Sequence, residues 1–356
     1  MIINRNELQK KLKALECAVA VKATIPSQTF LKWDNETMTT TNGYTSVITN
    51  IQLGIGDEIK ALIPFKPFKQ IIDKVGSRDV ELIIKDNQLA IKANRARFKL
   101  NLGDFNTFPN IDTFSAEKAF KINSSVLKDI EYKIAFCCAT DDKRMALKGL
   151  HFMCKENELT IVGTNSFRLA KMNIPFEGEF EFVIQAQDII NMAKIFGDNV
   201  ELSFGITDTG HCYFRDSETS YYPTLIDAKY PDTSRLIPNA TYNLTLDRED
   251  LLETIERISM ISTNERVIKV VFEKGLVTIS STNSELGSAS ESIECNCDFD
   301  MTMGCNGAYL AEALKRFANK EIKINLVEAR RPFTITSSAP DESNIIMLLL
   351  PVRIDG

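Results

Sequence analysis

The chain ends with the stretch Ile345-Ile346-Met347-Leu348-Leu349-Leu350, which is followed by Pro351-Val352-Arg353-Ile354. Six consecutive apolar residues predict a buried strand, and the proline, which has no amide hydrogen, marks where that strand leaves its neighbours. Two earlier segments end in a comparable way, at Phe108-Pro109 and at Tyr230-Pro231. These prolines are spaced by about 120 residues. The spacing indicates one unit written three times.

Three further landmarks recur at the same spacing. The first is the start of an amphipathic helix after a short strand, with Asn, Ser or Asp as a suitable N-cap, at residues 3–8, 122–127 and 246–251. The second is a Thr-Asn pair after a β-rich segment, at residues 41–42, 164–165 and 282–283. The third is a short helix that leads into a strand: 68–75 into 80–83, 188–196 into 200–203, and 309–317 into 322–324.

A period this long predicts repeated domains rather than a solenoid of small units. We therefore expect an α+β protein with three similar domains, at residues 1–116, 117–240 and 241–356, joined near 115–118 and 239–242. The alternative is that Thr-Asn and apolar-Pro pairs recur by chance. Four ordered landmarks at one spacing favour the repeat.

Composition restricts the class of protein further. With 44% hydrophobic and 25% charged residues, the chain is typical of soluble globular proteins. It has no apolar run of membrane-spanning length and opens without a signal-peptide pattern, so we expect a cytoplasmic protein. The eight cysteines include no Cys-x-x-Cys pair and are expected to be free, mostly buried thiols, with Cys295 and Cys297 alternating as in a strand.

Little in the sequence points to catalysis. The only histidines are His151 and His211, and His151 lies in an alternating pattern that places it on a strand face. No phosphate-binding loop, nucleophile elbow or zinc-protease motif occurs, and we expect no cofactor and no metal. The enzymatic alternative is a β-rich hydrolase that uses the carboxylate pair Asp141 and Asp142, or Asp298 with Asp300. Both pairs lie in loop-like stretches, so solvated loop charges are the favoured interpretation.

The chain resembles the bacterial beta sliding clamps, which are the processivity subunits of the replicative DNA polymerase. The similarity runs through the whole chain in order. It is carried by these stretches: 144–149 (RMALKG), 164–170 (TNSFRLA), 230–238 (YPDTSRLIP) and 350–353 (LPVR), and also 108–112 (FPNID), 284–287 (SELG) and 331–333 (RPF).

This resemblance implies three domains of one fold and a head-to-tail homodimer closed into a ring. Helices would line the hole, antiparallel sheets would lie outside, and duplex DNA would pass through without sequence preference. The implied partners are the catalytic subunit of the replicative polymerase, the clamp loader and other proteins with a clamp-binding motif. No membrane is implied. The rival classes are the hydrolase above and a modular binding protein without DNA; gel filtration separates them, because the ring requires a dimer.

The distribution of charge agrees with such a ring. The chain carries a net charge of −6, whereas the six segments predicted as helices are together net positive. The helix segment that starts at Arg248 is an exception, because it is net acidic. By resemblance, the DNA-binding residues are Arg5, Lys10, Lys22 and Arg144. The basic run usual before the second domain's second helix is absent, since residues 185–188 read Gln-Ala-Gln-Asp.

The resemblance also implies a groove for partner peptides between the second and third domains. Apolar side chains would wall it, prolines would fix its loops, and arginines would orient the peptide's carbonyl or carboxylate groups. The residues carried over are Leu147, Thr164, Phe167, Arg168, Leu169, Pro231, Arg235, Leu236, Tyr309, Pro332, Leu348, Leu350, Pro351, Val352 and Arg353.

The dimer interface implied by the resemblance joins the first domain of one chain to the third domain of the other. One side of this interface is basic and apolar, and the opposite side is acidic. Such complementary charges suit a specific interface. The residues carried over are Arg95, Arg97, Phe98 and Leu100 on the first domain, and Ile261, Glu285 and Glu291 on the third.

Overall fold

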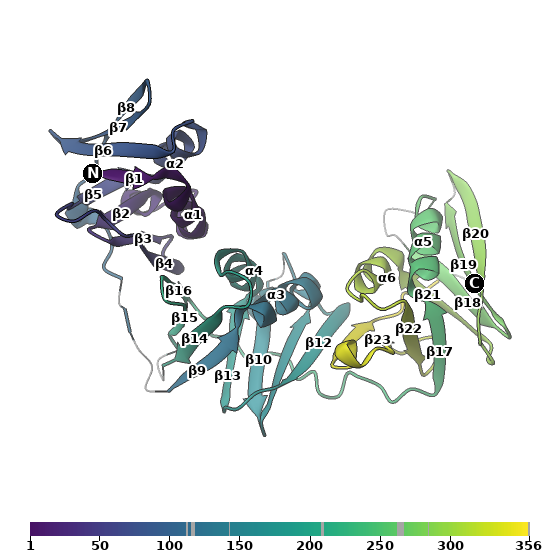
Figure 1. Ribbon diagram of the computed structural model, residues 1–356. Coiled ribbons are helices and arrows are strands. Elements are labelled where there is room, and N and C mark those ends of the chain that lie inside the picture. The colour runs from purple at the N-terminus through teal and green to yellow at the C-terminus, as the bar shows by residue number, and fades with distance from the viewer. Residues whose placement is uncertain are drawn as a thin grey trace. The chain divides into compact units, whose positions relative to one another are not determined.

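The structure is a computed structural model that describes residues 1–111, 113–114, 118–141, 143–207, 210–261, 267–283 and 285–354 (Figure 1). Several residues named above lie outside these ranges: Asp112, 115–117 of the first predicted boundary, Asp142, Ser284 and 355–356. The chain forms two compact units, residues 1–128 with 187–225 and residues 129–186 with 226–356. The three predicted domain ranges stay predictions.

The first unit contains twelve strands and two whole helices. The strands are β1 (Ile2–Asn4), β2 (Phe30–Asp34), β3 (Thr37–Thr41), β4 (Thr45–Asn50), β5 (Lys60–Pro64), β6 (Asp79–Lys85), β7 (Gln88–Ala93), β8 (Ala96–Asn101), β9 (Ala119–Asn123), β14 (Glu201–Ile206), β15 (Cys212–Arg215) and β16 (Thr219–Pro223). The helices are α1 (Arg5–Leu15) and α2 (Phe65–Lys74); α3 (Ser124–Lys133) and α4 (Ala186–Ile195) cross the unit limits.

The second unit contains the other twelve strands found in the described residues. They are β10 (Gly149–Lys155), β11 (Glu158–Thr164), β12 (Arg168–Pro175), β13 (Phe180–Gln185), β17 (Tyr242–Asp247), β18 (Val267–Glu273), β19 (Leu276–Asn283), β20 (Gly287–Glu294), β21 (Met301–Asn306), β22 (Glu321–Leu326), β23 (Phe333–Ser337) and β24 (Ile345–Leu349). Its helices are α5 (Arg248–Ser259) and α6 (Gly307–Leu314), with the 3-10 turns η4 (Ala135–Cys137) and η5 (Met145–Lys148).

The order of strands shows one topology three times. The orders β1-β6-β7-β8, β9-β14-β15-β16 and β17-β22-β23-β24 are equivalent, and so are β5-β2-β3-β4, β13-β10-β11-β12 and β21-β18-β19-β20. All pairings between these strands are antiparallel, which confirms an α+β fold. Two pairs fuse these four-stranded sheets into eight-stranded ones: β4 with β16, here called the first junction, and β12 with β24, here called the second junction.

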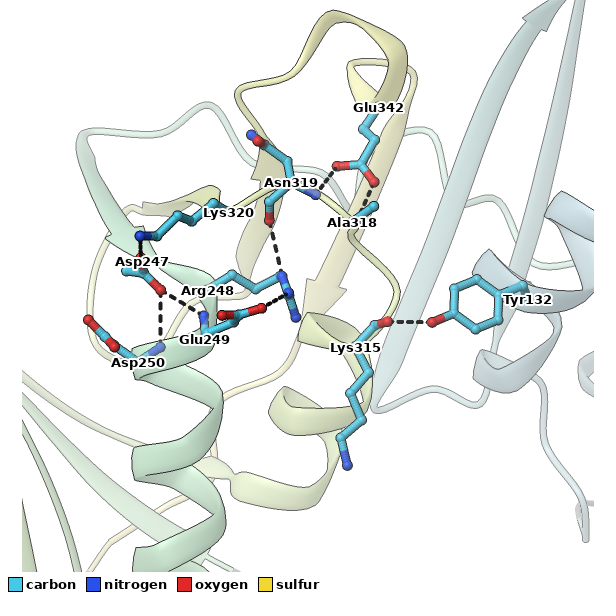
Figure 2. Close-up of polar contacts among 10 residues, drawn as sticks. All are labelled: Tyr132, Asp247, Arg248, Glu249, Asp250, Lys315, Ala318, Asn319, Lys320 and Glu342. Atoms are coloured by element: carbon cyan, nitrogen blue, oxygen red, sulfur yellow. Dashed lines mark hydrogen bonds and ion pairs between the residues drawn. The ribbon is translucent and has the colours of Figure 1, made fainter.

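The helix starts use one local chemistry. Asn4, Asn123 and Asp247 each end a strand, and the side-chain oxygen of each accepts from the first turn of the following helix. In each repeat, the first residue of that helix then bonds a carbonyl at or just beyond the end of the repeat's second helix. Arg5 Nε donates to the Ile72 carbonyl at 3.0 Å, Ser124 Oγ to Gly197 at 2.6 Å, and Arg248 Nε to Asn319 at 3.0 Å (Figure 2).

The Thr-Asn pairs form the same turn in all three repeats. Asn42 Oδ1 accepts from the amides of Tyr44 and Thr45, Asn165 Oδ1 from Phe167 and Arg168, and Asn283 Oδ1 from Glu285 and Leu286. In each case the chain then enters the strand that can form a junction: β4, β12 or β20.

The core agrees with the predicted helix periodicity. On α1, Leu8, Leu12 and Leu15 are completely buried, and α1 packs on β4 and α2, while α5 packs on α6, β19 and β20 (Figure 1). The strand predicted from the closing apolar run is confirmed as β24. The helices α2, α4 and α6 begin two or three residues earlier than predicted.

The cysteines are free, as predicted, and six of the eight are buried. One part of that prediction is wrong: Cys295 and Cys297 lie beyond the end of β20, in the segment before β21. Both residues instead bond one turn residue, because the Cys295 amide donates to the Gly275 carbonyl and the Cys297 carbonyl accepts from the Gly275 amide.

Candidate functional site

The turn that enters β12 pushes an aromatic side chain outwards. Asn165 Oδ1 accepts from the Phe167 amide at 3.0 Å and the Arg168 amide at 3.1 Å, and Thr164 Oγ1 donates to the Arg168 carbonyl at 2.7 Å. Ser166 takes a φ of +78°, which completes the tight turn. As a result Phe167 is 61% exposed although its neighbours at Thr164 and Leu169 are buried.

The closing strand lies directly beside this turn. Leu169 pairs with Leu348, and beyond the strand end the Leu350 amide donates to the Phe167 carbonyl at 2.9 Å. Leu169 and Leu348 belong to a buried apolar cluster, whereas Leu350 is exposed. The cluster also contains Ala146, Val162, Val183 and Tyr230, with Ile226, Ala228 and Ile237 packed against it.

The second junction therefore has a buried apolar floor beside exposed apolar side chains, which is the composition of many binding surfaces. Of the residues predicted for the groove, Leu147, Thr164, Leu169 and Leu348 are buried. The partly exposed ones are Arg168, Tyr309, Pro332, Pro351 and Val352, and the exposed ones are Phe167, Pro231, Arg235, Leu236, Leu350 and Arg353.

Two of the predicted groove residues, Val352 and Pro332, have their backbone contacts, or those of the next residue, elsewhere than at the turn of Phe167. The amide of Val352 donates to the Gly304 carbonyl at 2.8 Å, so the closing segment turns towards β21. Pro332 precedes β23, whose Phe333 pairs with Leu349 rather than with the turn at Phe167.

Arg168 is the best-connected of the predicted residues. Its guanidinium donates to Glu312 on α6 and to the Phe136 carbonyl, the latter at 2.6 Å. Its guanidinium carbon lies 4.3 Å from the centre of the Tyr309 ring and 5.0 Å from that of Phe136. The side chain is only 10% exposed, so its donors face the protein.

The buried thiols of Cys137 and Cys138, near this junction, are expected to be unreactive. Burial is the main cause that raises the pKa of both Cys137 and Cys138, that of Cys138 to about 12, although the nearby Arg168 acts in the opposite direction. A thiol that stays protonated is a poor nucleophile. No group of three or more His, Cys, Asp or Glu side chains in the described ranges is placed to hold a metal ion.

The predicted DNA-binding residues differ in their surroundings. Lys10 and Lys22 are exposed. Arg5 instead donates through Nε and Nη2 to the carbonyls of Ile72 and Asp73 at the end of α2. Arg144 donates to Ser166 Oγ at 2.9 Å, so it lies beside the second junction.

The predicted interface residues lie on or next to two sheet edges. Arg97, Phe98 and Leu100 lie on β8, with Arg95 in the turn before it, and Phe98 is 38% exposed. On the other side, Ile261 follows α5, Glu285 precedes β20 and Glu291 lies on β20. Arg257 donates to both carboxylate oxygens of Glu291, and these hydrogen bonds are the main cause that lowers the pKa of Glu291.

The sequence interpretation missed several residues at the second junction. Met145 is 52% exposed next to the buried Ala146, so it is a candidate rim residue. Phe136, Glu312 and Arg316 surround Arg168 or its partners. Met145 could have been found from its place in the quoted 144–149 stretch, but the contacts of the other three required the structure.

The carboxylates of the enzymatic alternative are surface groups. Asp141, Asp298 and Asp300 are exposed and lie in segments between elements, and Asp142 lies outside the described residues. Of the helices in the described ranges, none is long and apolar enough to cross a membrane.

Comparison with solved structures defines the class of protein. The chain superposes on DNA polymerase III beta chain from Streptococcus pneumoniae with a TM-score of 0.92 and 25% identity, covering 99% of both chains. It superposes on the DNA polymerase sliding clamp from Bacillus subtilis with a TM-score of 0.91 and 25% identity, again over 99% of both chains. The fold is that of a sliding clamp.

Sequence comparison identifies the family. The family models described as DNA polymerase III beta subunit, central domain, and DNA polymerase III beta subunit, C-terminal domain, match residues 121–232 and 234–353. The beta sliding clamps of Streptococcus pneumoniae serotype 4 and Bacillus subtilis strain 168 are each 27% identical, over 99% of this chain and 98% of theirs. The chain belongs to the bacterial beta sliding clamp family.

Proposed function

We propose that two copies of this chain close head to tail into a ring around duplex DNA, and that the ring tethers the replicative polymerase and other replication and repair proteins to the template. The chain acts as a processivity factor and not as a catalyst. Membership of the beta sliding clamp family supports this proposal. Two open sheet edges support it as well.

The observation that carries the ring is a pair of sheet edges left open. The strand that follows the Thr-Asn turn pairs with the last strand of the next repeat at both junctions, β4 with β16 and β12 with β24. Within the described residues, the equivalent strands β20 and β8 are edge strands of their sheets. Pairing β20 of one chain with β8 of another repeats the same junction, and two chains close the ring. Closure also covers edges that otherwise favour aggregation.

The dimer prediction is tested at β8. Phe98→Asp with Leu100→Asp places two carboxylates on the exposed edge strand and should give monomers in size-exclusion chromatography with light scattering. Ile84→Asp is the matched control, because Ile84 is 40% exposed on β6, which is not an edge strand. A double variant that remains dimeric in dilute solution contradicts this interface.

The second junction is proposed as the groove that binds partner peptides. Its floor is the buried cluster that contains Leu169 and Leu348, and its exposed apolar groups are Met145, Phe167 and Leu350. Burial of one leucine or phenylalanine of a peptide would contribute roughly 1.5–3 kcal/mol. Leu350→Asp should abolish binding of a labelled polymerase-derived peptide and leave the dimer intact. Unchanged peptide affinity would place the groove elsewhere.

Topological retention is the proposed way of holding DNA. The chain is net acidic, at −6, and Arg5 is engaged with α2, so phosphate contacts alone should hold DNA weakly at high salt. Protein loaded onto nicked circular DNA by a matching clamp loader should survive a high-salt wash and leave when the circle is cut. Equal loss from circular and linear DNA would contradict the ring.

The contribution of charge to DNA binding is tested separately. Lys10→Ala with Lys22→Ala should weaken low-salt binding but preserve high-salt retention of rings already loaded. Lys32→Ala with Lys60→Ala is the control, since both ammonium groups lie over the Phe105 ring of the same unit.

A further inference from the structure

Two arginines and three aromatic rings alternate at the second junction. The Arg316 guanidinium carbon lies 4.7 Å from the Tyr132 ring centre and 4.6 Å from that of Phe136. The Arg168 guanidinium carbon lies 5.0 Å from Phe136 and 4.3 Å from Tyr309. The resulting order is Tyr132, Arg316, Phe136, Arg168 and Tyr309, here called the stack. A guanidinium between two ring faces is favourable on both sides.

The stack connects elements of the second repeat with elements of the third. Tyr132 belongs to α3 and Phe136 to η4, whereas Tyr309 belongs to α6 and Arg316 follows it. At its outer end, which is Tyr132, the phenol Oη donates to the Lys315 carbonyl at 2.6 Å (Figure 2). At its inner end, which is Arg168 with Tyr309, Arg168 forms an ion pair with Glu312. The segment that follows α6 is therefore held at several points.

The inner end of the stack is part of the groove. Arg168 is the first residue of β12, between the exposed Phe167 and the buried Leu169, and it pairs with Leu349. Its Nη atoms donate to Glu312 and to the Phe136 carbonyl. Its Nε is buried without a hydrogen-bond partner. A bound peptide would therefore find both Nη atoms of Arg168 already engaged within the chain and its Nε out of reach.

We propose that Arg168 and Arg316 are positioning residues for the peptide groove and not peptide contacts. The stack sets the distance between the Thr164–Arg168 turn and α6, and so fixes where Phe167 and Leu350 stand. Arg316, which is not among the predicted groove residues, acts on the groove through Phe136 and Arg168. This inference rests on the proposed peptide-binding function of the second junction.

The test compares variants that remove the ring–guanidinium geometry with one that restores it. Arg316→Lys keeps the charge but loses the planar group, and Phe136→Leu keeps an apolar side chain but loses the ring face. Each should weaken binding of a fluorescein-labelled polymerase-derived peptide about tenfold in anisotropy titrations. Phe136→Tyr restores the ring and should bind as the wild type does. Unchanged affinity in both Arg316→Lys and Phe136→Leu overturns the proposal.

A control separates positioning from general loss of stability. Phe214 is buried on β15 in the first unit, and its ring stacks on Phe204 with centres 5.2 Å apart. Phe214→Leu should lower the unfolding temperature while leaving the peptide affinity unchanged. If Phe214→Leu weakens peptide binding as much as Phe136→Leu, the stack has only a structural role.

Hydrogen exchange tests the stack without any peptide. The Leu350 amide donates to the Phe167 carbonyl, so its exchange reports the register of the groove. Arg316→Lys and Phe136→Leu should speed exchange at residues 348–350, and Phe214→Leu should not. If the wild type binds no peptide, the proposed groove fails, while the exchange result still decides whether the stack positions this strand. Unchanged exchange overturns the proposal.

Discussion

The first and second junctions share a backbone plan but are held by different chemistry. At the first junction, Thr45 pairs with Pro223 where Arg168 pairs with Leu349 at the second. Thr45 and Arg168 both follow the Thr-Asn turn, and each side chain reaches the third residue of a second helix. Thr45 Oγ1 donates to the Asp188 carboxylate at 3.0 Å, whereas the Arg168 guanidinium lies over the Tyr309 ring.

The difference extends to the surroundings of these contacts. At the first junction, Asp188 is buried, and its Oδ1 also accepts from Tyr221 Oη at 2.7 Å. Lys11 on α1 reaches across to Glu218, with its nitrogen 2.7 Å from the carboxylate. At the second junction, arginines lie between aromatic rings. The repeated backbone thus fixes which positions meet, and the side chains decide how strongly and under which conditions they hold.

The two junctions also differ in how the space beside them is filled, and the first junction has a hollow. It has a volume of about 270 Å³ and is lined by Tyr44, which is exposed as its counterpart Phe167 is. However, Phe114 packs there against Tyr213 and Tyr222, with ring centres 5.7 Å and 5.6 Å away. At the first junction, Phe114 of the chain itself thus occupies part of this space. The corresponding place at the second junction has exposed apolar side chains.

The largest expected effect comes from removing the guanidinium of the second junction. Arg168→Met leaves the Phe136 carbonyl and Glu312 without their donor and should destabilise the second unit by about 3 kcal/mol. Urea unfolding followed by circular dichroism measures this loss. The fluorescence of Trp33, the only tryptophan and a buried residue of the first unit, is the internal control and should keep its midpoint. A shift of the Trp33 midpoint equal to that of the second unit would contradict the independence of the two junctions.

The next effect concerns binding. Phe167→Ala should weaken binding of the labelled polymerase-derived peptide about tenfold, because it removes an exposed apolar surface beside the floor of the proposed groove. Tyr44→Ala, its counterpart at the first junction, should change the affinity less than about twofold. Anisotropy titrations measure both values. A large loss in Tyr44→Ala would show that the first junction binds peptide as well.

The buried carboxylate predicts a pH dependence that is specific to the first junction. Burial is the main cause that raises the pKa of Asp188, more than offsetting the hydrogen bonds from Tyr221 and Thr45. The folded pKa lies above that of the unfolded chain, so this group lowers stability as pH rises from about 4 through the folded pKa. Asp188→Asn should therefore gain stability relative to the wild type as the pH rises through this range. Denaturation of both proteins at several pH values, followed at Trp33, measures the difference; a constant difference contradicts the prediction.

The smallest effect is expected at the ion pair of the first junction. Hydrogen bonding and charge from Lys11 lower the pKa of Glu218, so the stability gained from the pair is present above the unfolded pKa of glutamate and is lost as pH falls through the folded pKa. The Glu218 side chain is 55% exposed, so solvent can replace its partner. Lys11→Met should cost about 1 kcal/mol or less at pH 7 in the Trp33 transition. A loss comparable with that of Arg168→Met would show that the two junctions are energetically alike.

Sequence reasoning predicted the repeated plan well because its signals are local. A capping Asn or Asp, a Thr-Asn turn and an apolar run before proline each act within a few residues, and the elements follow from them. The roles of Arg5 and Arg168 could not be predicted in this way. Their partners Ile72 and Glu312 lie 67 and 144 residues away, and both arginines looked like surface cations until those partners were placed.

The position of Arg5 has a consequence for movement along DNA. Its guanidinium is bonded to two carbonyls at the end of α2, and Arg248 makes the equivalent bond at Asn319. Each cation that binds its own helix end is one fewer that must break from a phosphate at every step of translocation. In the proposed ring, cations that bind their own helix ends would lower the friction of one-dimensional diffusion. We therefore expect this clamp to travel fast on DNA, with a mobility that varies little with salt.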